Sequence, residues 1–253
     1  MPLRKIIVHT VIKSLLAVLC KVDYSALKKV PQNGPLILVG NHINFLDAPV
    51  SLTFLYPRPV ISLVKEETFD KPILKYLFNT WGSISIKRGT ADFKAFDNAL
   101  VSLESGKILA VSPEGTRTND GKLIRGQTGI VLLALKSGVP ILPVVFYGNE
   151  KFKINIKRIK RTYIKYEVGE PFKVINNHTY PSKEERQAIT DEIMYQLATL
   201  LPEGYRGHYS DLSKATTNYL DYDVDLTTLH YTSRQKISDA LGKHFSASEV
   251  ATE

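Results

Sequence analysis

The feature that most constrains the fold is an alternation of short strand-like runs with longer segments of helical periodicity. The strand-like runs occupy residues 35–39, 60–64, 84–86, 107–111 and 139–146. Segments with helical spacing lie between them, at residues 48–56, 73–81, 92–105 and 126–136. Alternating strands and helices predict an α/β fold with a largely parallel central sheet flanked by helices. In such sheets, functional residues gather beyond the carboxyl ends of the strands.

A polar block, Asn41-His42-Ile43-Asn44-Phe45-Leu46-Asp47, follows the first of these strands. Asp47 comes five residues after His42, near the start of the next predicted helix. The first helical turn could bring this carboxylate back to the imidazole, where it would fix the tautomer and stabilise the protonated ring. The other ring nitrogen would then serve as a general base. The competing interpretation is a surface histidine followed by a helix N-cap.

Three further blocks follow in order along the chain: Gly82-Ser83-Ile84-Ser85-Ile86-Lys87-Arg88, Ser112-Pro113-Glu114-Gly115-Thr116-Arg117 and Val139-Pro140-Ile141-Leu142-Pro143-Val144. With the His42 block, they resemble the four sequence blocks of the glycerolipid acyltransferase family, which includes 1-acylglycerol-3-phosphate acyltransferases. The resemblance covers roughly residues 30–175. It implies that His42 is the catalytic base and Asp47 its partner. It also implies that the acceptor is bound by Arg88, Glu114, Gly115 and Arg117.

The residue types of the Glu114 block suit a phosphorylated acceptor. Arg117 can hold a phosphate through two parallel hydrogen bonds, and backbone N–H groups around Gly115 and Thr116 can add further donors. We expect Glu114 to orient Arg117 or the backbone, or to accept a hydrogen bond from the acceptor's hydroxyl. Arg88 adds positive charge. The competing interpretation of this block is a surface turn with a weak ion pair.

Acyl transfer from a thioester to an alcohol requires a base for the attacking hydroxyl. The sequence has no Gly-x-Ser-x-Gly elbow for a serine nucleophile, so we predict direct attack by the acceptor and disfavour a hydrolase. The only cysteine, Cys20, has no Cys/His cluster beside it. No metal and no cofactor are therefore expected, and acyl-CoA or acyl-carrier protein would serve as the acyl-donor substrate. The lone cysteine also favours a reducing compartment.

The net charge of +8 indicates an acidic partner. No nucleic-acid-binding pattern is present, so we expect an anionic membrane surface and a phosphorylated substrate instead of nucleic acid. Residues 1–22 are mostly apolar, but Lys13 interrupts them too early for a bilayer-spanning helix. We predict an amphipathic helix in the membrane interface, with lysines reaching toward headgroups. A signal peptide and a helix packed on its own domain are the alternatives.

These features predict three parts: an N-terminal membrane-associating segment (1–30), an α/β acyltransferase domain (31–203) and a polar C-terminal extension (204–253) with a short helix near 235–244. Residues 151–166 carry seven cations and no acid. Lysines and apolar residues alternate over 151–157, which predicts a half-buried strand with a cationic outer face. Such a strand would protect a sheet edge or contact the membrane or the acyl donor.

The leading hypothesis is a membrane-associated acyltransferase, monotopic or peripheral, on the cytoplasmic face. It would transfer a fatty acyl group from acyl-CoA or acyl-carrier protein to the free hydroxyl of 1-acylglycerol 3-phosphate, giving phosphatidic acid. The alternatives are a glycerol-3-phosphate or other lysophospholipid acyltransferase, and a non-catalytic lipid-binding protein with the same fold. The expected partners are thus the membrane, the lysophospholipid acceptor and, if it is the donor, acyl-carrier protein.

Overall fold

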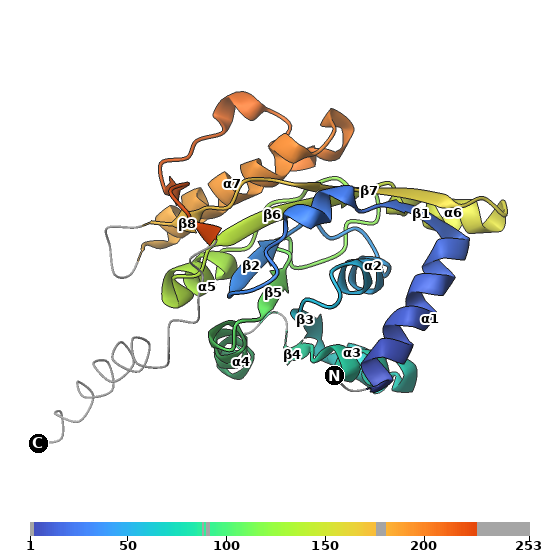
Figure 1. The fold of residues 1–253 in the computed structure, drawn as a ribbon. Coiled ribbons are helices and arrows are strands. Elements are labelled where there is room, and N and C mark those ends of the chain that lie inside the picture. Colours follow the sequence, from blue (N-terminus) through green and yellow to red (C-terminus); the bar gives the residue numbers. More distant parts are fainter. Residues whose placement is uncertain (1–2, 88, 90–91, 176–180, 227–253) are drawn as a thin grey trace, which may run out of the picture.

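The central sheet is built from seven strands in the order β1-β7-β6-β2-β5-β3-β4 (Figure 1). A computed structural model describes residues 3–87, 89, 92–175 and 181–226 of the chain. The strands are β1 (Cys20–Asp23), β2 (Leu36–Val39), β3 (Val60–Lys65), β4 (Ile84–Ile86), β5 (Ile108–Val111), β6 (Ile141–Tyr147) and β7 (Thr162–Val168). β2 to β6 run parallel, whereas β7 is antiparallel to β6 and parallel to β1. The predicted α/β fold with a largely parallel sheet is confirmed.

Helices cover both faces of this sheet (Figure 1). One core contains residues of α1 (Leu3–Leu19), α2 (Asp47–Phe54) and α3 (Pro72–Trp81). The other contains residues of α4 (Phe93–Glu104), α5 (Gly129–Ser137) and α7 (Lys183–Leu200). Along β2, Leu36 and Leu38 belong to the first core and Ile37 and Val39 to the second. Because β2 is buried on both faces, its sequence is continuously apolar.

The segment after β6 differs from its prediction. Residues 151–157 do not form a strand: a 3₁₀ turn (Asn149–Lys151) leads into α6 (Phe152–Lys157). Phe152 is buried, while Ile154 and Ile156 project outward, with exposed fractions of 54% and 46%. An alternation over seven residues is too short to distinguish a strand from a short helix by pattern alone. The half-buried alternation occurs later, in β7, where every second residue is buried.

The N-terminal segment forms the expected helix, α1, but its residues face in unexpected directions. His9 is buried and stacks on Tyr56 with ring centroids 4.1 Å apart, and the Lys13 amine lies 6.0 Å from the centroid of Phe54. Lys13 is nevertheless exposed, and its predicted reach toward lipid headgroups stays a prediction. Apolar side chains occupy both faces of α1, so a division into one apolar and one polar face is not shown. None of the helices in the described ranges is long and apolar enough to cross a bilayer.

The polar segment after α7 packs back onto the domain. It contains three 3₁₀ turns (Glu203–Tyr205, Gly207–Tyr209 and Leu212–Lys214), and β9 (Leu220–Asp221) pairs with β8 (Lys173–Val174). The buried carboxylate of Glu192 accepts hydrogen bonds from the Thr216 hydroxyl and from two backbone N–H groups of the segment. Two further 3₁₀ turns, Ser25–Lys29 and Glu66–Asp70, complete the described elements. The helix predicted near 235–244 lies outside the described residues.

Candidate active site

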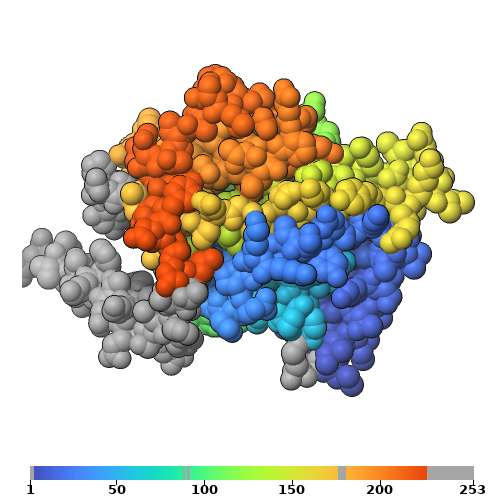
Figure 2. All heavy atoms as spheres, turned by 45° about the horizontal axis from the view of Figure 1, so that its top comes forward, coloured from blue at the N-terminus to red at the C-terminus, as the bar shows by residue number. Residues whose placement is uncertain are grey.

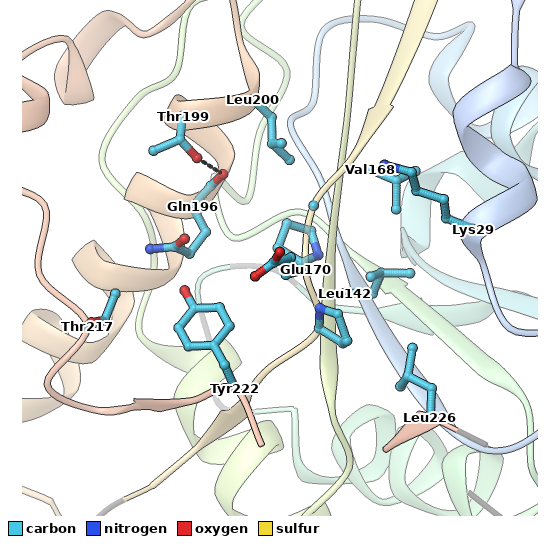
Figure 3. Close-up of a pocket in the computed structure, with 13 residues that line it drawn as sticks. Lys29, Leu142, Val168, Glu170, Gln196, Thr199, Leu200, Thr217, Tyr222 and Leu226 are labelled. Carbon is cyan, nitrogen blue, oxygen red and sulfur yellow. Dashed lines mark hydrogen bonds between the residues drawn. The ribbon is translucent and has the colours of Figure 1, made fainter. Parts of the chain in front are cut away.

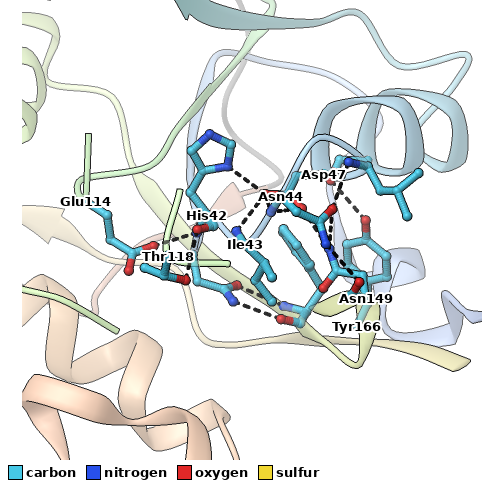
Figure 4. A network of polar contacts seen from close by, with 12 residues as sticks. His42, Ile43, Asn44, Asp47, Glu114, Thr118, Asn149 and Tyr166 are labelled. Carbon is cyan, nitrogen blue, oxygen red and sulfur yellow. Dashed lines mark hydrogen bonds and ion pairs between the residues drawn. The ribbon is translucent and has the colours of Figure 1, made fainter. Parts of the chain in front are cut away.

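The His42 block begins where β2 leaves the sheet between β5 and β6. A Cβ on Gly40 would lie 2.6 Å from the Val144 carbonyl oxygen, so only glycine fits this exit. Asn41 then fastens the chain to β6: its side-chain amide donates to the Phe146 carbonyl (2.9 Å), and its side-chain oxygen accepts from the Phe146 N–H (3.1 Å). These contacts hold His42 at the carboxyl edge of the sheet (Figure 4).

The predicted approach of Asp47 to His42 is present. The distance from His42 Nδ1 to Asp47 Oδ2 is 2.6 Å. Because a carboxylate only accepts hydrogen bonds, Nδ1 is the donor of this contact, and in the neutral ring Nε2 then carries the lone pair. Nε2 makes no hydrogen bond with any residue in the described part of the chain. A histidine held in this tautomer can accept a proton from a bound hydroxyl, although its catalytic role remains a prediction.

Asp47 is the centre of a buried network at the start of α2 (Figure 4). Besides His42, its carboxylate accepts hydrogen bonds from the backbone N–H groups of Ile43 (2.7 Å) and Asn44 (3.0 Å). It also accepts one from the side-chain amide of Asn149, at 2.7 Å. Several donors around one carboxylate fix its direction.

Asn149 was not predicted from the sequence. It is 1% exposed, and its backbone carbonyl accepts a hydrogen bond from the Asn44 side chain (2.8 Å), so the two loops are tied together in both directions. One signal was available: Asn149 follows a buried strand, as His42 and Glu114 do. A Cβ on Gly148, which has φ 99°, would meet the Tyr163 carbonyl oxygen at 2.2 Å, so this turn also requires glycine.

Glu114 lies beside the His42 loop, which comprises residues 40–46 between β2 and α2. Its side chain is buried, with 2% of the residue exposed. One carboxyl oxygen accepts the His42 N–H (2.5 Å), and the other accepts the Ile124 N–H (3.1 Å). Burial raises the pKa of Glu114 to about 7, against the opposite effect of these two N–H donors. Of the roles we considered, the geometry matches orientation of the backbone. The expected contact with Arg117 is not among the interactions of the described residues.

The rest of this block forms an exposed turn. Gly115, Thr116 and Arg117 are all exposed, and Gly115 has φ 67°. Arg117 forms no ion pair or hydrogen bond with the residues described, which leaves its guanidinium available to an anion. The next residue, Thr118, donates its N–H to the His42 carbonyl (2.9 Å), so the turn lies beside the His42 loop. Arg88 lies outside the described residues.

A cavity of about 630 Å³ opens elsewhere, between α7 and the start of β6 (Figure 3). Pro143, Gly169, Gln196 and Tyr222 are among its lining residues. It lies toward the opposite end of β6 from Asn149, so it is separate from the His42–Asp47 pair. No group of three or more potential metal-ligating side chains occurs within the ranges that the structure describes.

Comparison with known proteins identifies the family. A sequence model of the acyltransferase family matches residues 21–147, which is half of the chain and includes His42, Asp47 and Glu114. The chain belongs to the acyltransferase family. The predicted relationship to glycerolipid acyltransferases is therefore confirmed at the level of the family.

Individual relatives of this acyltransferase agree with that placement. It is 26% identical to a 1-acyl-sn-glycerol-3-phosphate acyltransferase of Borreliella burgdorferi over 71% of this chain and 73% of that protein. It is 32% identical to a lyso-ornithine lipid O-acyltransferase of Pseudomonas aeruginosa over 44% of this chain and 42% of that protein. The crystal structure of a 1-acyl-sn-glycerophosphate acyltransferase from Thermotoga maritima has the same fold, with a TM-score of 0.55, 24% identity and 78% coverage of both chains. The chain spans less than half the length of several plant relatives that it matches.

Proposed function

We propose that this acyltransferase moves a fatty acyl group from an acyl thioester to the free hydroxyl of 1-acylglycerol 3-phosphate, giving phosphatidic acid. The donor would be acyl-CoA or acyl-carrier protein. The observation that carries the proposal is the 2.6 Å contact between His42 and Asp47, which presents Nε2 as a base at the carboxyl edge of the sheet. The name of the Borreliella burgdorferi relative supports the choice of acceptor.

In the proposed reaction, Nε2 of His42 takes the proton of the acceptor's hydroxyl as its oxygen attacks the thioester carbonyl. Asp47 stabilises the imidazolium that forms. The tetrahedral intermediate then collapses, the carbon–sulfur bond breaks, and the leaving thiolate receives the proton from His42. No covalent acyl-enzyme is required, because the acceptor's own hydroxyl is the nucleophile.

The acceptor's phosphate is assigned to the exposed turn of the Glu114 block. The Arg117 guanidinium is exposed and unpaired within the described residues, and this turn is tied to the His42 loop through Thr118. A planar guanidinium can hold two phosphate oxygens at once. The acceptor would thus be held through its phosphate while its hydroxyl lies at Nε2.

Membrane association is supported by the outward face of α1. We define the α1 stripe as Leu3, Ile7, Val11, Leu15 and Val18, which are 53% to 71% exposed. A helix that only packs on its own domain buries its apolar face. Here a second apolar row points outward while the buried His9 faces the domain, which suits a monotopic or peripheral contact with lipid. We place that contact on the cytoplasmic face because the lone Cys20 favours a reducing compartment.

The test offers the purified chain, in detergent, a radiolabelled acyl thioester and a panel of acceptors. The panel includes 1-acylglycerol 3-phosphate, glycerol 3-phosphate and lysophospholipids without an exposed phosphomonoester. We expect transfer to 1-acylglycerol 3-phosphate, and a loss of roughly 10²- to 10⁴-fold in kcat for His42→Ala and Asp47→Asn. His208→Ala, at an exposed histidine, is the matched control. Normal turnover by a folded His42→Ala chain would refute the mechanism, and preference for another acceptor would refute the assigned substrate.

A further inference from the structure

We propose that α6 and the turn that follows it form a second membrane contact, specific for anionic lipid. We call residues 152–160 the α6 tip. The inference rests on the proposed membrane association and extends it, since the α1 stripe is apolar and carries no preference for lipid charge. It would give the enzyme two contacts with the bilayer, one apolar and one selective for negative headgroups.

The α6 tip carries positive charge that no acidic residue within it neutralises. It contains four cations and no acidic residue: Lys153, Lys157, Arg158 and Lys160. All four are exposed, and none forms an ion pair with another residue in the described part of the chain. Unpaired cations gathered on a protruding surface attract a negatively charged partner.

Three isoleucines are exposed among these cations. Ile154, Ile156 and Ile159 have exposed fractions of 54%, 46% and 97%. A protein that only protects an edge with lysines has no need of aliphatic side chains at the same place. Cations that surround exposed aliphatic residues match the interface of a bilayer, where apolar groups lie below the headgroups and Lys and Arg extend to them.

Ile159 is difficult to explain by folding. It has φ 53° at the end of α6, where its N–H donates to the Ile156 carbonyl (3.2 Å) and the Lys160 N–H donates to the Asn155 carbonyl (2.9 Å). This is the helix-ending position that glycine usually occupies, and a β-branched residue is strained there. Since the side chain is almost wholly exposed, burial in the folded chain does not offset the strain. Contact with lipid would supply a reason for isoleucine at this position.

The α6 tip lies beside the end of α1. The Arg161 guanidinium donates two hydrogen bonds to the Cys20 carbonyl, at 2.6 and 3.2 Å, where α1 passes into β1. Figure 1 shows α6 and α1 on the same side of the molecule, and in Figure 2 the yellow α6 segment protrudes next to the dark blue of α1. One bilayer surface can therefore contact both.

The same tip is joined to the proposed catalytic loop. The Phe152 ring packs edge-on against Phe45, within the His42 block, with centroids 5.8 Å apart. Membrane contact at the α6 tip would consequently hold the His42 loop close to the interface, where a lysophospholipid acceptor resides. An acidic carrier protein is the other partner that the charge could fit, but it would not require the exposed isoleucines.

The experiment measures binding of the full chain to vesicles by co-sedimentation, with pure phosphatidylcholine or phosphatidylcholine mixed with phosphatidylglycerol. The first variant is Lys157→Gln, Arg158→Gln and Lys160→Gln combined. Its matched control removes three exposed lysines elsewhere, as Lys136→Gln, Lys173→Gln and Lys183→Gln. We expect the tip variant to bind anionic vesicles about a hundredfold more weakly than the control, because each cation near an anionic surface contributes roughly fivefold.

The second variant, Ile159→Gly, separates membrane binding from folding. Glycine suits φ 53°, so the Tm should stay constant or rise, while binding to both vesicle types falls roughly tenfold. Ile175→Gly, at an isoleucine that is 48% exposed, is its control. Unchanged vesicle binding in both tip variants would overturn the proposal. A raised KM for acyl-carrier-protein donors with unchanged vesicle binding would also overturn it, and would assign the tip to the donor.

This outcome is independent of the proposed function. Vesicle binding requires no turnover, and the tip variants should keep wild-type acyl transfer in detergent. If the wild-type chain transfers no acyl group in detergent but the vesicle results hold, the proposed reaction fails and the membrane contact stands.

Discussion

Substitution of Asn149 can show whether the His42–Asp47 pair is held by charge or by shape. The Asn149 side-chain amide donates to Asp47 at 2.7 Å, and the residue is 1% exposed. Asn149→Ala removes this donor and leaves a space. Asn149→Asp keeps the shape but replaces the donor with a second carboxylate.

Asn149→Asp should reduce stability and kcat/KM more than Asn149→Ala does, because it adds a negative charge. A hydrogen bond to a charged group is worth about 1.5–3 kcal/mol, which sets the cost of Asn149→Ala. Asn149→Asp loses the same bond and adds repulsion between carboxylates about 3 Å apart, which is roughly 5.5 kcal/mol at an effective dielectric constant of about 20. At pH 8 the order of stability and of kcat/KM should therefore be wild type, then Asn149→Ala, then Asn149→Asp.

The pH dependence provides the second signature. In Asn149→Asp, one of the paired carboxyls can relieve the repulsion by holding a proton, and the folded chain then binds that proton more tightly than the unfolded chain. The stability deficit should accordingly shrink as the pH falls from 8 toward 5 and grow as it rises. Asn149→Ala has no added carboxyl and should show no such change.

Urea denaturation at pH 8 and pH 5, together with steady-state kinetics in detergent, measures both quantities. Asn98→Asp, at an exposed asparagine, controls for the added charge. If Asn149→Asp proves more stable and more active than Asn149→Ala at pH 8, shape and not charge holds the pair, and the electrostatic reasoning is wrong.

Three other predictions follow from single side chains. Arg117→Lys and Arg117→Ala should raise the KM for the phosphorylated acceptor and leave the KM for the thioester unchanged, with a loss of several hundredfold in kcat/KM if two charged hydrogen bonds are lost. Steady-state kinetics with each substrate varied in turn tests this, and the reverse pattern would assign Arg117 to the donor. Arg58 is 7% exposed and donates to three backbone carbonyls, so Arg58→Lys should lower the free energy of unfolding by about 3 kcal/mol, and an unchanged urea midpoint would contradict it. Because the pKa of Glu114 is raised to about 7, its contribution to the free energy of unfolding should fall by up to ~3 kcal/mol as the pH rises from about 4.5 to about 7; Glu114→Gln should remove this slope, and a slope equal in both chains would refute it.

The sheet could be predicted because its strands are buried in a way that the sequence displays. All four residues of β2 are buried, so the run is apolar from end to end, and the polar block after it marks the carboxyl edge. The pairing of His42 with Asp47 was also predictable, since the two are five residues apart and one helical turn closes the contact. Buried strands and contacts between residues close in sequence can thus be predicted from local spacing.

Other features depend on contacts that local spacing does not encode. Asn149 meets Asp47 across 102 positions of sequence, and nothing in either block specifies the other. The prediction for residues 151–157 failed because a brief alternation of lysines and isoleucines fits a strand as well as a short helix whose apolar side chains are exposed. The pattern records which residues are apolar, whereas their direction depends on what the helix packs against.

The segment after α7 contributes to the support of the loop that carries His42. Glu114 holds the backbone of both His42 and Ile124, so the position of the 121–126 loop affects that of His42. That loop is in turn paired with the extension: Leu123 donates its N–H to the Tyr205 carbonyl (3.0 Å) and accepts from the His208 N–H (2.8 Å). A Cβ on Gly207 would lie 2.2 Å from the Leu123 carbonyl oxygen, so the two backbones are in direct contact. The described residues after α7 thus hold the 121–126 loop in place. Through Glu114, that loop in turn supports the backbone of His42.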